Sequence, residues 1–149
     1  MMARLPWYST LIGFSLLVIF IAALTVIFFP LAAPPSSPTV AFIDLPEQPA
    51  IGHPFPVSWR VDSSPTSTPF TAIYFDTIAT PSALTASDYP DRVGYRYHTT
   101  DFTSGTFDLP DTFTAILTPP PRADTLYLRG YAKINGQHFW TDEITLTLH

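Results

Sequence analysis

Four histidines are the residues of this chain best suited to metal chemistry, because imidazole nitrogens bind zinc and copper. Two of them, His98 and His138, fall in segments that read as strands, and a two-layered β-fold brings distant strands side by side. A blue-copper centre would also need a cysteine ligand, and the chain contains none. The sequence therefore predicts no metal and no other cofactor, with a two-histidine site at His98 and His138 as the alternative.

Two pairs of aspartates have the ligand type that calcium prefers. Asp88 and Asp91 form one pair and Asp108 and Asp111 the other, and each pair flanks a dipeptide that ends in proline. Calcium takes about six to eight oxygen ligands, whereas aspartates beside proline commonly form solvated turns. We therefore predict turns at both places rather than calcium sites.

Nucleophilic and phosphate-transfer chemistry lack their usual sequence signals. The chain has no Gly-x-Ser-x-Gly motif and no glycine-rich phosphate loop, and it contains only 6 glycines. The absence of cysteine also excludes disulfides, thiolate zinc sites, iron–sulfur clusters and covalently attached haem. The sequence predicts a protein that is not an enzyme.

An alternating segment near the C-terminal end is the best candidate for a binding surface. In residues 126–134, small or aliphatic side chains alternate with aromatic and basic ones, so a strand would direct the two sets to opposite faces. Tyrosine and arginine are enriched at interface hot spots. The predicted partner surface consists of Tyr95, Tyr97, Tyr127, Arg129, Tyr131 and Lys133. Cross-strand pairing on a solvated sheet face is the alternative, and a glycan would use the same aromatic side chains.

These side chains must be positioned by strands, because residues 40–149 show β-type patterning without helical periodicity. The predicted strands are 39–44, 55–62, 71–76, 93–99, 106–109 with 113–117 close behind, 126–134 and 138–148. Phe55, Val57, Trp59 and Val61 are predicted to share one buried face. Asn135-Gly136 predicts a tight hairpin turn between the last two strands. The segment 77–92 has no clear strand period and is predicted to be a surface excursion with a short helical turn.

About seven strands, a tryptophan in the second, and the closing pattern LYLRGYAKINGQHFWTDEITLTL together resemble the immunoglobulin-like and fibronectin type III-like sandwiches. The resemblance covers residues 40–148 and concerns the fold pattern. The cysteine pair and the Tyr-x-Cys corner of antibody domains are absent, so the fibronectin-like variety is the closer comparison. The resemblance implies an antiparallel β-sandwich and no particular function.

The segment Leu11–Phe29 is an unbroken apolar run without a charged residue, which predicts a transmembrane helix. Arg4 precedes it and the next basic residue is Arg60, so the positive-inside rule puts the N-terminus in the cytoplasm. The predicted organisation is a cytoplasmic N-terminus (1–10), the transmembrane helix (11–30), a Pro/Ser-rich linker (31–39) and an extracytoplasmic β-sandwich (40–149). A cleaved signal peptide is the alternative, although the apolar run is longer than usual for one.

Two features of the apolar run bear on assembly. Ser15, Ala22 and Ala23 are small residues that would let another transmembrane helix approach closely. The segment Gly13–Val18 resembles the start of the type IV pilin signature, which implies a filament subunit. However, Val18 stands where the pilin pattern has its glutamate, and prolines from residue 30 onward would interrupt the long helix of such subunits.

The charge distribution limits the choice of partners. All 12 acidic residues follow the apolar run, so the predicted extracytoplasmic part is acidic and would repel nucleic acid. The predicted partners are the lipid bilayer and other membrane or envelope proteins. The sequence thus predicts a single-pass cell-membrane protein with a non-catalytic interaction domain, acting as an accessory subunit of a larger membrane complex. The alternatives are a pilin-like filament subunit and a metal- or glycan-binding sandwich.

Overall fold

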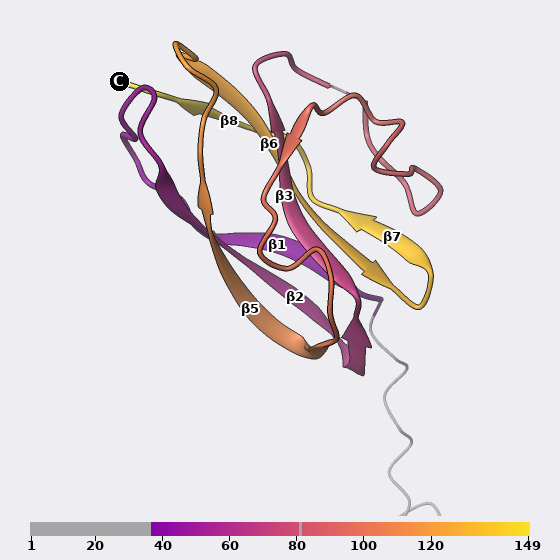
Figure 1. Cartoon of the computed structure of the whole chain (residues 1–149). Coiled ribbons are helices and arrows are strands. Elements are labelled where there is room, and N and C mark those ends of the chain that lie inside the picture. The colour runs from indigo at the N-terminus through magenta and orange to yellow at the C-terminus, as the bar shows by residue number, and fades with distance from the viewer. Residues whose placement is uncertain (1–36, 81) are drawn as a thin grey trace, which may run out of the picture. The chain divides into compact units, whose positions relative to one another are not determined.

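The computed structural model describes residues 37–80 and 82–149, which form eight β-strands in two antiparallel sheets (Figure 1). The strands are β1 (Thr39–Asp44), β2 (Phe55–Thr68), β3 (Phe70–Asp76), β4 (Tyr97–His98), β5 (Phe107–Leu117), β6 (Thr125–Ile134), β7 (Gln137–Trp140) and β8 (Ile144–Thr147). The predicted all-β class is confirmed for this part of the chain.

Residues 1–36 lie outside the described residues. The predictions for the cytoplasmic N-terminus, the transmembrane helix, its packing residues Ser15, Ala22 and Ala23, and most of the linker therefore stay predictions. Within residues 37–80 and 82–149, no helix has the length and apolar character needed to cross a bilayer.

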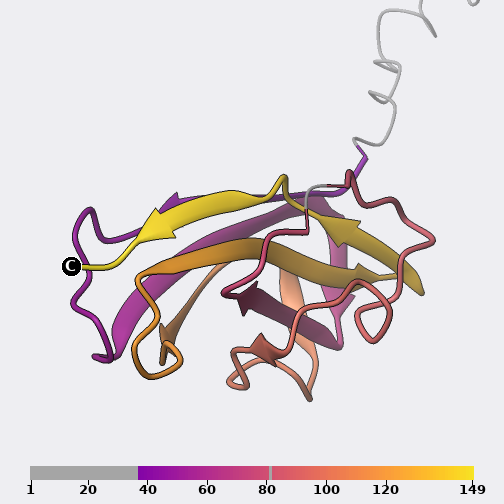
Figure 2. The ribbon, with the colours of Figure 1, turned by 90° about the horizontal axis from the view of Figure 1, so that it is seen from above.

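The two sheets face each other around a shared core (Figures 1 and 2). One sheet has the strand order β1-β2-β5, and the other has the order β4-β3-β6-β7, with β8 also paired to β6. Side chains of both sheets form one hydrophobic cluster between the layers. Within the described part, the two layers therefore have the arrangement of a β-sandwich.

The alternation predicted for the second strand is confirmed. Phe55, Val57, Trp59 and Val61 are all buried in the core between the sheets. Because successive side chains of a strand point to opposite faces, this single set is enough to fix which face of β2 meets the other sheet.

Trp59 links the two layers by packing and by hydrogen bonding. Its ring stacks on Phe113 of the neighbouring strand β5, with a centroid distance of 5.8 Å. Its indole N–H donates to the Thr71 hydroxyl of the opposite sheet (2.8 Å), which donates in turn to the Tyr131 carbonyl (2.6 Å). A buried tryptophan needs such a partner for its N–H group, and here the partner fixes the position of one sheet over the other.

Several strands differ in length from the prediction. The strand β2 continues to Thr68 instead of ending at Asp62, because a register shift between Val61 and Thr66 lets the chain pass the irregular stretch while still pairing with β5. The predicted segments 106–109 and 113–117 are a single strand, β5, so the turn predicted at Asp108 and Asp111 is wrong: both residues pair with β2. The predicted strand 93–99 is reduced to the two residues of β4.

The last predicted strand is divided into β7 and β8, which both pair with β6. Thr141 lies at the break, where its N–H donates to the Gly130 carbonyl (2.9 Å) and its hydroxyl accepts from the Gly130 N–H (2.9 Å). A Cβ atom at Gly130 would lie 3.0 Å from side-chain atoms of both Thr141 and Val40. Glycine therefore permits the close approach of chains at this point.

The hairpin predicted at Asn135-Gly136 is confirmed. This turn joins β6 to β7, and the two residues have φ values of 50° and 80°. A type I′ turn requires positive φ at both central positions, which asparagine and glycine adopt more readily than other residues.

Candidate ligand-binding site

The candidate site lies on the outer face of the five-stranded sheet, which the segment 77–96 partly covers. This segment, called the insert below, leaves β3 and returns to β4, passing beside β7 on the way (Figures 1 and 2). It contains hydrogen-bonded turns, Asp88 N–H to Thr85 O and Arg92 N–H to Tyr89 O, and among its described residues no helix, so the predicted helical turn is wrong.

The exposed strip predicted for the sheet is also wrong for three of its six residues. Tyr95, Arg129 and Tyr131 are buried, with only 3% of Arg129 and 2% of Tyr131 exposed. The reason is physical: Arg129 and Tyr131 do leave the sandwich core, but the insert, to which Tyr95 belongs, folds over them. Of the other predicted partner residues, Tyr97 and Lys133 are exposed and Tyr127 is partly buried. No observation tests the partner role of the six.

The covered face holds a second, smaller core. Tyr74 of β3 and Tyr131 of β6 lie at its centre, with edge-to-face rings whose centroids are 5.6 Å apart. Trp140 of β7 packs against both rings, with centroid distances of 5.3 Å to Tyr74 and 4.5 Å to Tyr131. Its indole N–H donates to the Asp88 carbonyl of the insert (3.1 Å). The aromatic side chains of the sheet thus bind the insert by packing and by a hydrogen bond.

Arg129 fastens the other half of the insert. Its guanidinium donates to the Tyr95 hydroxyl and to the carbonyls of Thr80, Ser82 and Thr141, each at 2.9 Å. These four bonds satisfy a charge that would otherwise be costly to bury. Arg129 is therefore a structural group that holds the insert to the sheet.

Glu143 completes this network from the break between β7 and β8. Its carboxylate accepts from the Tyr95 hydroxyl and from the Thr80 N–H group (2.8 Å). Burial and the bond to Glu143 raise the pKa of Tyr95. The tyrosine therefore stays protonated and donates to the carboxylate.

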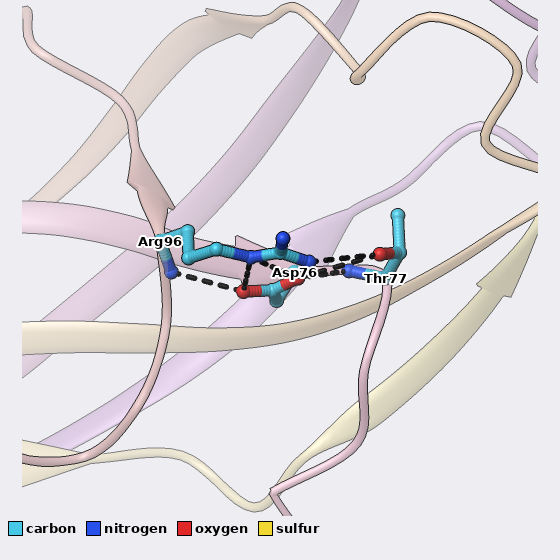
Figure 3. A network of polar contacts seen from close by, with 3 residues as sticks. All are labelled: Asp76, Thr77 and Arg96. Atoms are coloured by element: carbon cyan, nitrogen blue, oxygen red, sulfur yellow. Dashed lines mark hydrogen bonds and ion pairs between the residues drawn. The ribbon is translucent and has the colours of Figure 1, made fainter.

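A second clamp closes the base of the insert, where Arg96 meets Asp76 (Figure 3). The Asp76 carboxylate accepts from Arg96 Nε (2.8 Å), from Arg96 Nη2 (2.5 Å) and from the backbone N–H groups of Arg96 and Thr77. The hydrogen bonds from Arg96 lower the pKa of Asp76 to about 2. Asp76 is buried while Arg96 is half exposed, so the pair seals the end of β3 against solvent.

An open pocket of about 280 Å³ remains where the insert meets the sheet, and it is called the aromatic pocket below. Its lining comes from both parts: Tyr89, Pro90 and Asp91 belong to the insert, and the others belong to β3, β6 and β7. The full lining is Phe70, Tyr74, Tyr89, Pro90, Asp91, Tyr131, Lys133 and His138. Tyr89 stands at the rim with 52% of its surface exposed, whereas Tyr74, Tyr131 and His138 are buried.

The polar groups of the aromatic pocket are neutral inside and charged at the rim. Nδ1 of His138 shares a 2.7 Å hydrogen bond with the Tyr131 hydroxyl. Burial, followed by nearby Lys133, lowers the pKa of His138, which favours the neutral imidazole. Burial raises the pKa of Tyr74 to about 12, with a further contribution from Asp91. Lys133 and Asp91 are both exposed.

The candidate metal ligands have other partners. His98 stacks on Tyr74 with a centroid distance of 5.2 Å, and His138 stacks on Tyr131. Across residues 37–80 and 82–149, no three His, Asp or Glu side chains are grouped so that they could hold one metal ion. Asp88 accepts from the N–H and hydroxyl groups of Thr85, which is the behaviour of a turn-forming aspartate.

Sequence reasoning placed Tyr131 and Lys133 on the correct face of the strand but missed Tyr89 and Phe70 as neighbours. The proline-flanked Tyr89 carried the available signal, because a large aromatic residue in a polar, strandless segment has few core positions to fill. In comparisons with known proteins, the chain matches no protein-family model, no curated protein and no solved structure.

Proposed function

We propose that this chain is a membrane-anchored, non-catalytic interaction domain that binds a partner outside the cytoplasm through the aromatic pocket and its rim. The observation that carries the proposal is the pocket itself: an aromatic interior, a half-exposed tyrosine at the entrance, and the charged side chains of Asp91 and Lys133 at the rim. Binding sites in proteins commonly combine an apolar lining with a small number of placed polar groups.

The finer fold assignment belongs to the same proposal. One sheet holds the first, second and fifth strands, and the other is built on the third, sixth and seventh, with the fourth and eighth also paired into it. This division corresponds to strands A, B, E and C, F, G of the immunoglobulin-like sandwich, an architecture common in cell-surface domains. Trp59 lies on the second strand, whereas antibody domains have their buried tryptophan on the third, which supports the fibronectin-like variety.

The membrane location is supported by the sequence of the first 36 residues. The apolar run Leu11–Phe29 would span a bilayer, and Arg4 would keep the N-terminus in the cytoplasm. The acidic β-domain would then project from the opposite side, where it would serve as an accessory subunit of a membrane complex. Ser15, Ala22 and Ala23 would face a neighbouring transmembrane helix.

Affinity isolation from membranes dissolved in mild detergent tests this function. The full chain is expected to bring down a companion at fixed stoichiometry, and the substitution Tyr89→Ala is expected to remove it. Ile116→Ala is the matched control, because Ile116 is also a large exposed side chain (58%) but lies on β5 of the other sheet, outside the aromatic pocket and outside the predicted partner surface. A companion lost equally from both variants, or recovered fully with Tyr89→Ala, would contradict the role of the pocket.

A further inference from the structure

We infer that the aromatic pocket binds a neutral sugar ring, one unit of a glycan. This inference rests on the proposed function and adds the chemical class of the ligand. Four observations support it: the aromatic lining, the donor and acceptor groups at the rim, their opposite charges, and the volume.

The lining suits a ligand with an apolar face. Phe70 and Tyr89 offer partly or half-exposed rings at the entrance, and the buried rings of Tyr74 and Tyr131 lie beneath them. A pyranose presents C–H groups on the faces of its ring and hydroxyl groups around its edge. Aromatic rings with a polar tip, such as tyrosine, match such an amphipathic ligand because they combine an apolar surface with a hydrogen-bonding group.

The rim suits a ligand that both donates and accepts hydrogen bonds. The Lys133 ammonium only donates and the Asp91 carboxylate only accepts. In the described part of the chain, neither group takes part in an ion pair or a side-chain hydrogen bond, so both are available. Hydroxyl groups donate and accept, so a polyhydroxylated ring satisfies both residues at once.

The charges at the rim disfavour ionic ligands. Lys133 and Asp91 contribute one positive and one negative charge, and burial lowers the pKa of His138, which favours its neutral form. A phosphate would be attracted by Lys133 but repelled by Asp91, and a quaternary ammonium group would be attracted by Asp91 but repelled by Lys133, so the rim gives neither ion a net electrostatic gain. A rim without net charge therefore favours a ligand without net charge.

The volume limits the ligand to one ring at a time. Sites for drug-sized molecules enclose about 300–1,000 Å³, and this pocket of about 280 Å³ lies just below that range. Its entrance beside exposed Tyr89 leaves room for the rest of a glycan to continue into solvent. For a ligand of this size, we expect a dissociation constant on the order of 1 mM.

Titration calorimetry and ligand-observed NMR on the full chain test the inference. The chain is kept in a polyoxyethylene detergent, since sugar-headgroup detergents would compete for the site. The probes are the methyl pyranosides of glucose, galactose, mannose and N-acetylglucosamine, with choline and inorganic phosphate as the ionic alternatives. We expect saturable binding of at least one pyranoside, weakened about 5- to 10-fold by Tyr89→Ala and unchanged by the control substitution Ile116→Ala.

Two substitutions of Asp91 separate a hydroxyl ligand from a cation. Asp91→Asn keeps an acceptor and is expected to retain sugar affinity within about 3-fold, whereas Asp91→Leu removes the acceptor and is expected to lower it about 10-fold. A ligand weakened equally by both changes would be recognised through charge, which would overturn the inference. Each variant is compared with the parent chain in thermal unfolding, and since Asp91 is exposed both should fold.

Failure of the inference is distinguishable from failure of the proposed function. Absence of pyranoside binding, or saturable binding of choline or phosphate instead, overturns the sugar assignment. If a protein companion still depends on Tyr89 in the affinity isolation, the proposed function stands with a protein as its partner. If neither a sugar nor a companion depends on Tyr89, both are wrong.

Discussion

At the scale of single residues, Asp76 shows how hydrogen bonds from neighbouring groups lower the pKa of a buried carboxylate. The carboxylate is 3% exposed and receives hydrogen bonds from the side chain and backbone of Arg96, which lower its pKa from 3.8 to about 2. Arg60 and Asp62 form a pair with a similar 2.8 Å contact, but both side chains are about half exposed. The two pairs therefore offer a matched comparison of a buried and a solvated carboxylate.

We predict that Asp76→Asn destabilises the protein by about 1–2 kcal/mol at pH 7. The native pKa lies below the ordinary value, so this stabilisation is fully present above about pH 4 and is lost as the pH falls through about 2. Urea unfolding followed by tryptophan fluorescence should give a lower free energy of unfolding for the variant than for the parent at pH 7, and this difference should narrow toward pH 2. Asp62→Asn is the control and should change stability by less than about 0.5 kcal/mol. A difference in free energy of unfolding that is as large at pH 2 as at pH 7 would contradict this account.

At the scale of elements, the insert decides which side chains of β6 reach solvent. The alternation along β6 was predictable from sequence, because period-2 burial follows directly from strand geometry. Arg129 and Tyr131 do leave the sandwich core, as predicted, yet they are buried. Their burial was not predictable, because it depends on a segment with no strand or helix period that docks through individual hydrogen bonds.

The same reasoning explains the errors in strand bounds. The sequence Ser63-Ser64-Pro65 reads as a turn, but β2 continues through it with a register shift against β5. In contrast, β1 and the Asn135-Gly136 turn were predicted correctly because each rests on local preferences alone. The aromatic pocket required contacts between residues far apart in sequence, so its composition could be anticipated only in part.

We predict that Arg129→Met detaches the insert and destabilises the protein by about 3 kcal/mol. The substitution keeps the apolar part of the side chain but leaves three carbonyls and the Tyr95 hydroxyl without their donor. Hydrogen exchange should rise in residues 82–96 while the strands of the three-stranded sheet keep their protection. Lys133→Met is the control, because it makes a comparable change at an exposed site of the same strand and should stay within about 0.5 kcal/mol. Equal exchange in both variants would show that Arg129 does not hold the insert.

At the scale of the whole molecule, the chain divides into an apolar beginning and an acidic β-domain. The apolar run Leu11–Phe29 has no charge, and all 12 acidic residues follow it. Such a division is what a single-pass membrane protein requires, since one part must be stable in lipid and the other in water.

We predict that the combined substitution Leu17→Arg and Phe20→Arg releases the full chain from membranes. Each arginine near the centre of a transmembrane helix costs about 2.5–3.5 kcal/mol on insertion scales. Extraction of membranes with alkaline carbonate should leave the parent chain in the pellet and move the variant to the supernatant. Ser9→Arg with Thr10→Arg adds the same charge before the apolar run and should stay in the pellet. A parent chain recovered in the supernatant would refute the anchor.

The two-part lining of the aromatic pocket has a thermodynamic consequence. Tyr89 and Asp91 come from the insert, while Lys133 and His138 come from the sheet. A ligand bound in the aromatic pocket would therefore contact both parts and link them. The two equilibria are coupled, so the free energy by which a bound ligand stabilises the docked insert equals the binding free energy that is lost when the insert is detached. Saturation with a ligand should therefore slow amide hydrogen exchange in residues 82–92. The substitution Arg129→Met, which detaches the insert, should weaken ligand affinity by a corresponding factor.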